Sequence, residues 1–449
     1  MKWLKVLLTG ILVDLFYFPV WFTFFPSQIS KNILAAVGLV FAVFYLIKKR
    51  SLDVPRELLM LIMLAGLVSV ISLISITYNQ TPDDTYVTYI ISASIWLSAA
   101  FAVCCVIKTV HGYVDVPIIV KYLTGVCVFQ CFSAMAIQFF PPFSTLVDQL
   151  FILGQTSLRD LGRIYGIGAS LDVGGSRFAA VLIGICYMMQ RRETEGNVPQ
   201  LFLWVLSFAI ITVIGNMIAR TTIIGVILGL VCLFFLKVYH LKDPETPRTG
   251  KLLIAWVLAL GTAIPICVSL YQTVPLFNDL LRFGFEGFFS LYEEGTWMVG
   301  SNEALKSMVV WPEELRTWII GDGYFANSRN DPNYLGNTTE EGFYMGTDIG
   351  YLRFIFYFGV PGLLAMSAVI IWSTVFSSRY FQKDTVLFLF FAAANFVIWA
   401  KVSTDLFLVF CPFMAAAMIN LDFPPEREKG DADTDAPPEE LESCESSTA

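Results

Sequence analysis

The stretch from Leu201 to Leu236 reads LFLWVLSFAIITVIGNMIARTTIIGVILGLVCLFFL, and it consists of two apolar runs that meet near Arg220. Each run is long enough, as a helix, to cross most of a hydrocarbon layer that is roughly 30 Å thick. An arginine between two such helices lies at the edge of the membrane, where it can hold an anionic ligand. The stretch therefore predicts a hairpin of membrane helices with a cation at its turn.

The composition of the whole chain is that of a membrane protein. Of its 449 residues 56% are hydrophobic, 15% aromatic and 15% charged, and the mean hydropathy is +0.67. Helices satisfy their own backbone groups in lipid, so we expect an all-α polytopic membrane protein with about twelve transmembrane helices. The expected spans are Trp3 to Phe25, Asn32 to Ile47, Leu58 to Tyr78, Tyr86 to Ile107, Pro117 to Phe139, Gly175 to Met189, Leu201 to Gly215, Thr221 to Lys237, Leu252 to Tyr271, Ile349 to Ser373, Val386 to Ala400 and Phe407 to Asn420.

Clusters of basic residues predict the orientation of these spans. Lys48 to Arg50, Arg191 with Arg192, and the basic residues between Lys237 and Lys251 fall on one face if the spans alternate. Basic residues collect on the cytoplasmic face, so we expect both termini in the cytoplasm.

The same alternation divides the chain into one transmembrane unit and a tail. Residues 1–420 form the transmembrane unit, with a long extracytoplasmic loop, residues 272–348, between the ninth and tenth spans. Residues 421–449 are rich in Pro, Glu, Asp and Ser, and we expect a disordered, acidic cytoplasmic tail.

Cysteine and histidine usage argues against a disulfide framework and a zinc site. All nine cysteines except Cys444 fall in expected spans, and the two histidines, His111 and His240, fall in expected cytoplasmic loops. The chain also lacks the glycine-rich phosphate loop of ATP-driven proteins. We therefore expect no metal and no cofactor, and no nucleic-acid partner is expected either.

Three arginines on the expected outer side are the first candidates for a ligand site. Arg163 and Arg177 flank a glycine-rich segment that includes Gly174, and Arg220 precedes the next helix. Glycines allow close approach of a ligand to the backbone, and a guanidinium fork gives two hydrogen bonds to phosphate oxygens. We expect Arg163, Arg177 and Arg220 to converge on one pocket for a diphosphate, although a single arginine can also be a headgroup anchor.

Carboxylates and aromatic rings are interleaved in the long outer loop, a combination that suits a sugar ligand. Aromatic rings stack on the apolar faces of sugars, and carboxylates accept hydrogen bonds from hydroxyl groups. Amphipathic helices at the membrane surface would carry similar residues. The residues expected to bind substrate, together with Gly174, are Arg316, Asp322, Tyr324, Glu341 and Tyr351.

Three short motifs, in this order, resemble one known family. Arg163 is separated by ten residues from Gly174, Ala219-Arg220-Thr221-Thr222 opens a helix, and Asp348-Ile-Gly-Tyr351-Leu352 leads into Phe358-Gly359-Val-Pro-Gly362-Leu. The pattern is similar to that of the O-antigen polymerases of the Wzy type, within the O-antigen ligase and polymerase superfamily. A second arginine-x10-glycine element is missing from the long loop, where Arg316 before Gly321 and Gly323 is the nearest substitute.

The resemblance implies an activity, its partners and a location in the cytoplasmic (inner) membrane of a bacterium. The protein would polymerise oligosaccharide repeat units linked to undecaprenyl pyrophosphate, as a metal-independent glycosyltransferase at the outer face of the membrane. A chain-length regulator is a further partner that this resemblance suggests. Ligases of the superfamily place a histidine in the long outer loop, and its absence here favours a polymerase over an O-antigen ligase.

Catalysis by this reaction needs cations for the leaving pyrophosphate and a base for the acceptor hydroxyl. Arg163, Arg177 and Arg220 are expected to supply the cations. Asp348 is the chosen base, because desolvation where the loop rejoins the membrane would raise its pKa. Other candidates for the base are Glu341, Glu294 and Asp322. An alternative role for Asp348 is to cap the following helix.

Two other functions stay open on the sequence alone. A transporter or flippase of lipid-linked oligosaccharide would recognise pyrophosphate with the same arginines. A glycosyltransferase that uses polyprenyl-phosphate sugars would use Asp83 and Asp84 as its acidic outer pair.

Some remaining residues have a packing or local interpretation. Gly225 and Gly229 predict close helix packing. Lys401 and Asp405, four residues apart, predict a local ion pair. Asp14 lies within the first span, where a carboxylate can mark an ion path.

Overall fold

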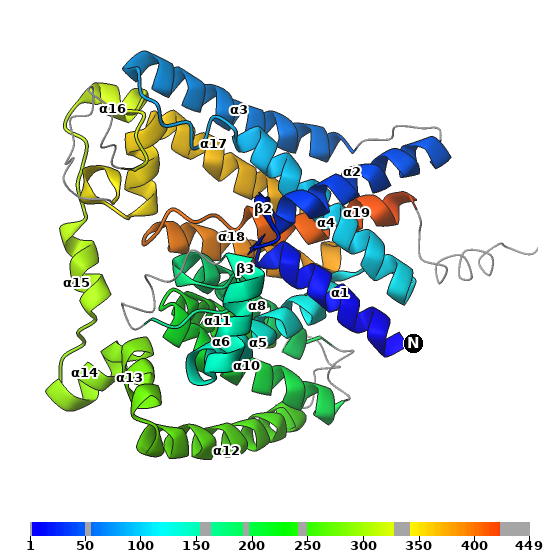
Figure 1. The fold of residues 1–449 in the computed structure, drawn as a ribbon, viewed down its shortest axis with the longest axis vertical. Coiled ribbons are helices and arrows are strands. Elements are labelled where there is room, and N and C mark those ends of the chain that lie inside the picture. The colour runs from blue at the N-terminus through cyan, green and yellow to red at the C-terminus, as the bar shows by residue number, and fades with distance from the viewer. Residues whose placement is uncertain are drawn as a thin grey trace, which may run out of the picture.

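The computed structural model describes residues 2–49, 55–152, 163–191, 197–240, 249–326 and 342–422. Most of the described chain is helical (Figure 1). The longer helices are α1 (Lys2–Tyr17), α2 (Ser30–Lys49), α3 (Arg56–Asn79), α4 (Tyr89–His111), α5 (Val116–Phe139), α8 (Leu171–Met189), α10 (Val198–Ile218), α11 (Thr222–His240), α12 (Thr249–Thr273), α17 (Gly350–Tyr380), α18 (Thr385–Trp399) and α19 (Phe407–Asp422).

Seven of the described helices are long and apolar enough to cross a membrane, namely α3, α4, α5, α8, α10, α17 and residues Ile254–Thr273 of α12. Further apolar segments of α2, α11 and α19 are shorter. The predicted class, an all-α membrane protein with several spans, is confirmed. The count of about twelve spans stays a prediction, and the acidic tail beyond residue 422 lies outside the described residues.

The first helix ends earlier than predicted. The expected span ran to Phe25, but α1 ends at Tyr17, and a small antiparallel sheet of β1 (Trp21–Phe22), β2 (Phe25–Ile29) and β3 (Phe151–Ile152) follows in the order β2-β1-β3. The physical reason is Pro19, because the residue before a proline is disfavoured in helical geometry. The apolar run continues for eight residues, or about two helical turns, beyond the end of α1. Hydropathy alone therefore overestimated the length of this helix.

The centre of the bundle is built on α8, which is buried along most of its length. Helix α11 packs closely against it because of two glycines. A Cβ on Gly225 would lie 2.2 Å from Cα of Ala179, and one on Gly229 would lie 3.0 Å from Sγ of Cys186. The predicted role of Gly225 and Gly229 in close helix packing is confirmed.

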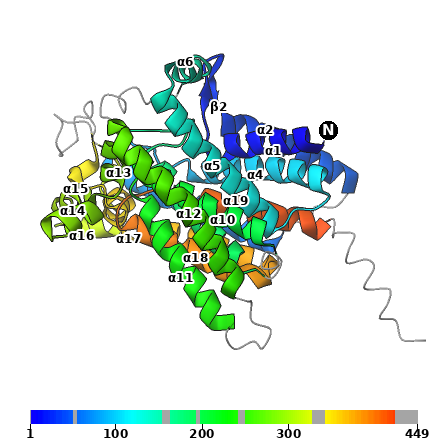
Figure 2. The ribbon, with the colours of Figure 1, turned by 90° about the horizontal axis from the view of Figure 1, so that it is seen from below.

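A segment of short helices joins α12 to α17 along one end of the bundle (Figures 1 and 2). It contains α13 (Pro275–Gly284), α14 (Glu286–Glu294), α15 (Gly300–Ser307), α16 (Leu315–Ile319) and the 3-10 turn η1 (Tyr344–Gly346). We call this part of the chain the α13–α16 segment. The turn η2 (Gln382–Asp384) and α6 (Pro141–Leu150) complete the described helices.

Helix α17 is interrupted near its start. Phe358 (φ −140°, ψ 19°) and Gly359 (φ 71°, ψ −176°) leave helical geometry, and Pro361 follows. A Cβ on Gly359 would lie 2.6 Å from the carbonyl oxygen of Ile319 in α16. Glycine is therefore required at this position both for its positive φ and for the close approach of α16.

The backbone groups released by this interruption are bound by the protein itself. The carbonyl of Phe356 accepts a hydrogen bond from N–H of Asp322 at 2.6 Å. The carbonyl of Tyr357 accepts from N–H of Gly323 at 3.1 Å and from the Ser75 hydroxyl at 2.7 Å. The interruption thus fixes the end of the α13–α16 segment to the bundle.

Candidate functional site

Arg220 lies in the tight turn between α10 and α11 and is held by the α13–α16 segment. Its Nε donates a hydrogen bond to the carbonyl of Phe283 at 2.9 Å, and its Nη1 donates to the Ser301 hydroxyl at 3.2 Å. Its Nη2 forms an ion pair with Glu286 at 2.7 Å. The guanidinium is thereby fixed in orientation at the end of the bundle that carries the α13–α16 segment.

Arg163 meets Arg220 at the aromatic ring of Phe283. The guanidinium carbon of Arg220 lies 4.1 Å from the ring centroid, and that of Arg163 lies 5.6 Å from it. Burial lowers the pKa of Arg220, Glu286 opposes this shift, and the charge of Arg163 adds to it. We call Arg163, Arg220, Phe283 and Glu286 the Phe283 site.

The Phe283 site contains more positive than negative charge. Glu286 neutralises Arg220, whereas Arg163 forms no ion pair with any of the residues that the structure describes. Two guanidinium groups around one ring repel each other, and a multivalent anion would relieve that repulsion. The arrangement is therefore suited to a phosphate or diphosphate.

Arg177 does not join this pair, and the expected convergence of three arginines is wrong in this respect. Its side chain is buried in α8, with its guanidinium carbon 5.5 Å from the ring centroid of Phe18 and 5.9 Å from that of Trp96. Lys31 lies over the same Trp96 ring at 4.6 Å. The reason is the helical position of Arg177, two turns into α8, which directs it into the bundle rather than toward the glycine-rich segment.

Asp405 interacts electrostatically with Arg177 and Lys31. Burial raises the pKa of Asp405, the N–H of Phe407 lowers it by donating a hydrogen bond, and the charges of Arg177 and Lys31 lower it further. Asp405 is therefore the counter-charge of these two cations. The predicted pair of Lys401 with Asp405 is not among the ion pairs that the structure describes.

Lys401 instead joins the turn that follows Arg220. Its Nζ lies 3.4 Å from Oδ1 of Asp172 and 3.2 Å from the Thr221 hydroxyl, and this hydroxyl also donates to Asp172. Asp172 belongs to the first turn of α8. Residues from α8, the α10–α11 turn and the α18–α19 turn are thus linked directly beside Arg220.

Asp348 lies close to this link. Burial raises its pKa to about 6, Arg353 opposes the shift, Asp172 adds to it and Lys401 opposes it. Its Oδ1 lies 3.4 Å from Nη1 of Arg353. The alternative that Asp348 caps the following helix is wrong, because the N-cap of α17 is Ile349, and no side chain caps it.

Arg353 holds Asp348 in place and was not predicted. Its Nη1 donates to the Ser403 hydroxyl at 2.9 Å and its Nη2 to the carbonyl of Phe325 at 3.0 Å. The guanidinium carbon lies 3.6 Å from the ring centroid of Phe325 and 4.4 Å from that of Phe343. An arginine within an apolar run was its only sequence signal.

Three of the predicted substrate-binding residues form one cluster where the α13–α16 segment docks on α17. Asp322 accepts hydrogen bonds from Arg316 at 3.1 Å, from the Thr317 hydroxyl at 2.7 Å and from the Tyr344 hydroxyl at 3.2 Å. Tyr324 stacks on Tyr344 with ring centroids 5.3 Å apart. Burial raises the pKa of Asp322, while Thr317 and Arg316 oppose the shift.

The other predicted substrate-binding residues lie elsewhere. Tyr351 donates its hydroxyl hydrogen to the carbonyl of Phe396 at 2.8 Å, so it joins α17 to α18. Gly174 packs closely against the preceding loop, since a Cβ there would lie 3.3 Å from the carbonyl carbon of Ala169. Glu341 lies outside the described residues.

Glu286 and Phe283 are the residues of the site that sequence reasoning missed. Glu286 is one of many carboxylates in the long loop, and its partner Arg220 is 66 positions away, so neither periodicity nor spacing indicates the pair.

Among the described residues, no group of three His, Cys, Asp or Glu side chains is arranged to hold a metal ion.

Comparisons with protein-family models, with curated proteins and with solved structures found no match to this chain.

Proposed function

We propose that the protein polymerises oligosaccharide repeat units that are carried on undecaprenyl pyrophosphate, by glycosyl transfer at the outer face of a bacterial cytoplasmic membrane. The observation that supports this most is the meeting of Arg163 and Arg220 at the Phe283 ring. The sequence predicts that both arginines bind pyrophosphate, and they come from segments that are distant in sequence.

The proposed role of the Phe283 site is to bind the pyrophosphate of the donor and to stabilise it as it leaves. Arg163 offers a charge that no carboxylate of the described residues pairs with, and Arg220 offers one that Glu286 holds at 2.7 Å. The diphosphate displaces Glu286 from Arg220 because it brings more negative charge and accepts two hydrogen bonds from each guanidinium. Charge is then stabilised where the anomeric bond breaks.

Asp348 is the proposed base of the same reaction. The acceptor hydroxyl attacks the anomeric carbon, the bond from that carbon to the pyrophosphate oxygen breaks with its electron pair, and the hydroxyl proton passes to the Asp348 carboxylate. A pKa of about 6 is suited to this step near neutral pH. Thr221, Asp172 and Lys401 link the Asp348 region to the turn of Arg220.

The orientation belongs to this proposal. With twelve spans and cytoplasmic termini, the Phe283 site, Asp348 and the α13–α16 segment all lie on the extracytoplasmic side. A chain-length regulator would then approach the same side. The short helices α13 to α16 lie along one end of the bundle (Figure 1), which supports a single active face.

A flippase is the second candidate, and the interrupted helix α17 bears on it. Transporters use interrupted helices to expose backbone groups to a ligand. Here the carbonyls of Phe356 and Tyr357 are bound by Asp322, Gly323 and Ser75. The interruption therefore supports anchoring of the α13–α16 segment more than ligand transport.

The proposal is tested with purified protein, lipid-linked repeat units and a gel that resolves the products. We expect Arg220→Ala to abolish chain extension, and Arg220→Lys to restore little of it because the two-pronged hydrogen bonding is lost. Arg282→Ala is the matched control, since Arg282 lies on the same segment and forms an exposed ion pair with Glu293 at 2.5 Å. A full ladder of products from Arg220→Ala would refute the proposal, and translocation without polymer would establish a flippase.

A further inference from the structure

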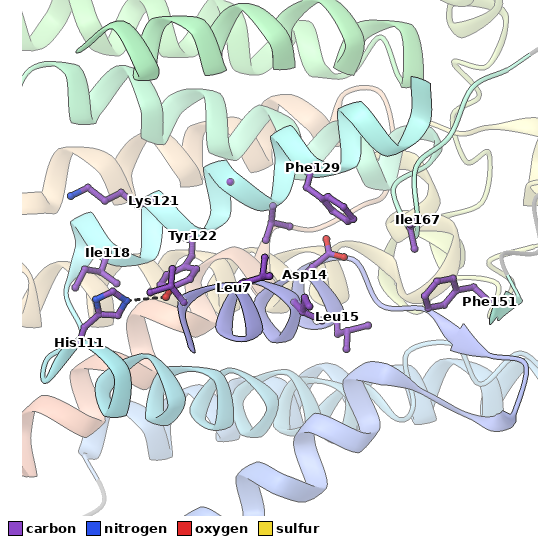
Figure 3. A pocket seen from close by; sticks show the side chains of 15 residues that line it. Leu7, Asp14, Leu15, His111, Ile118, Lys121, Tyr122, Phe129, Phe151 and Ile167 are labelled. Atoms are coloured by element: carbon purple, nitrogen blue, oxygen red, sulfur yellow. Dashed lines mark hydrogen bonds between the residues drawn. The ribbon is translucent and has the colours of Figure 1, made fainter. Parts of the chain in front are cut away.

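An apolar groove of about 690 Å³ runs between α1 and α5, away from the Phe283 site. Figure 3 shows its lining side chains along both helices. One end carries His111, Ile118 and Lys121, and the other reaches Phe151 and Ile167. The wall between these ends is almost entirely apolar, with Leu7, Ile11, Val126 and Phe129 among its residues.

Two glycines keep the groove open. Gly10 of α1 and Gly125 of α5 both line it, and a Cβ on either would have no neighbouring atom within 4 Å. Other glycines of the bundle, such as Gly225, are in close contact with a neighbouring helix. The glycines of the groove therefore leave space that the protein does not fill.

The rim of the groove exposes large apolar side chains. Leu7 is 62% exposed, Ile11 50% and Phe129 48% in the protein alone. Such exposure of large apolar side chains on adjoining helices is typical of a surface that lipid covers.

The dimensions of the groove are suited to hydrocarbon chains. The groove follows α5 from Ile118 to Phe129, which is about 16 Å at the helical rise. Its volume is about 690 Å³, and its lining is apolar over most of this length.

A positive charge marks one end of the groove. Lys121 is exposed there and forms no ion pair with any residue in the described parts of the chain. Beside it, the His111 ring and the Tyr122 hydroxyl are hydrogen-bonded at 2.9 Å. Asp14 lies further along the groove (Figure 3). Its carboxylate accepts a hydrogen bond from the Gln130 amide at 2.8 Å. The end with Lys121 is thus suited to an anionic headgroup.

We propose that this groove binds an anionic phospholipid, with hydrocarbon in the space between α1 and α5 and the phosphate beside Lys121. Apolar burial provides the attraction for the chain, and basic residues at the end of a membrane helix attract acidic headgroups. The inference does not depend on the proposed polymerase activity, because the groove shares no residue with the Phe283 site.

The occupant of the groove is tested with full-length protein in lipid nanodiscs that contain phosphatidylglycerol with a photoreactive acyl chain. We expect crosslinks to α1 and α5, and we expect Gly125→Leu to reduce them at least tenfold by filling the groove. Gly261→Leu is the matched control, because Gly261 lies in α12, also has no atom within 4 Å of a built Cβ, and is not part of the groove. If Gly125→Leu does not fold, Gly10→Leu provides the same test.

The headgroup is tested in a second arm with matched phosphatidylglycerol and phosphatidylcholine probes. We expect a preference of about fivefold for phosphatidylglycerol, lost in Lys121→Gln and kept in Lys237→Gln, which changes an exposed lysine of α11. Crosslinking that Gly125→Leu leaves unchanged would overturn the groove as the binding site. Equal labelling by the two lipids would overturn the anionic headgroup.

Discussion

Glu286 holds Arg220 in an ion pair of 2.7 Å, although the two residues belong to different parts of the chain, α14 and the α10–α11 turn. If pyrophosphate must displace Glu286, the carboxylate competes with the donor. We therefore expect Glu286→Gln to lower KM for the lipid-linked donor by about threefold, in line with a partly exposed ion pair of less than 1 kcal/mol. Steady-state rates at varied donor concentration measure this change.

The control for this variant is Glu293→Gln, which removes the partner of Arg282 on the same segment. We expect it to leave KM unchanged. A higher KM for Glu286→Gln would show that Glu286 helps to position the donor instead of competing with it.

The raised pKa of Asp348 predicts how the rate of the proposed reaction depends on pH. Burial raises its pKa to about 6, and the base must be deprotonated to accept a proton. The rate should therefore be constant above about pH 7 and fall as the pH drops through about 6. Asp348→Asn should lower kcat at least 100-fold and leave donor binding in place. A wild-type profile that stays flat down to pH 5, or an active Asp348→Asn variant, would assign the base elsewhere.

The helices were predictable from sequence because long apolar runs and the membrane thickness determine them. The close packing at Gly225 and Gly229 was also predictable, since small residues four apart on a helix allow a neighbouring helix to approach closely. The end of α1 was not read correctly. Its aromatic residues continue the apolar run through Pro19, and hydropathy does not register the backbone constraint that a proline imposes.

The candidate site was predictable only in its charges. Arg163 and Arg220 stood out because arginines are unusual on the expected outer side, but their common neighbour Phe283 had no distinguishing sequence context. Arg177 was placed wrongly because spacing along the chain does not fix the side of α8 on which a residue lies until the packing of that helix is known. The Lys401–Asp172 pair, formed between residues more than 200 positions apart, depends on tertiary structure alone.

Removal of divalent metal tests whether arginines carry the charge stabilisation. Because Arg163 and Arg220 supply positive charge at the Phe283 site, we expect polymerisation by the purified protein to continue in EDTA at its initial rate. The same assay with added Mg²⁺ serves as the reference. A strict requirement for the metal would assign charge neutralisation to an ion rather than to these side chains.

Substitution of Gly359, at the interruption of α17, and of Gly261, in the regular helix α12, should change stability in opposite directions. Gly359 has φ 71° and lies against the carbonyl of Ile319, so Gly359→Ala should strain the backbone and separate α16 from α17. We expect it to lower the free energy of unfolding by about 1–3 kcal/mol. Gly261→Ala in α12 meets no atom within 4 Å and should raise this free energy by up to about 1 kcal/mol through helix propensity. Thermal unfolding of the two variants in the same detergent measures the difference in stability. Labelling of a cysteine introduced by Thr317→Cys reports detachment of α16. Equal melting temperatures for the two variants, with Thr317 still protected in Gly359→Ala, would show that the close approach at Gly359 does not anchor the segment.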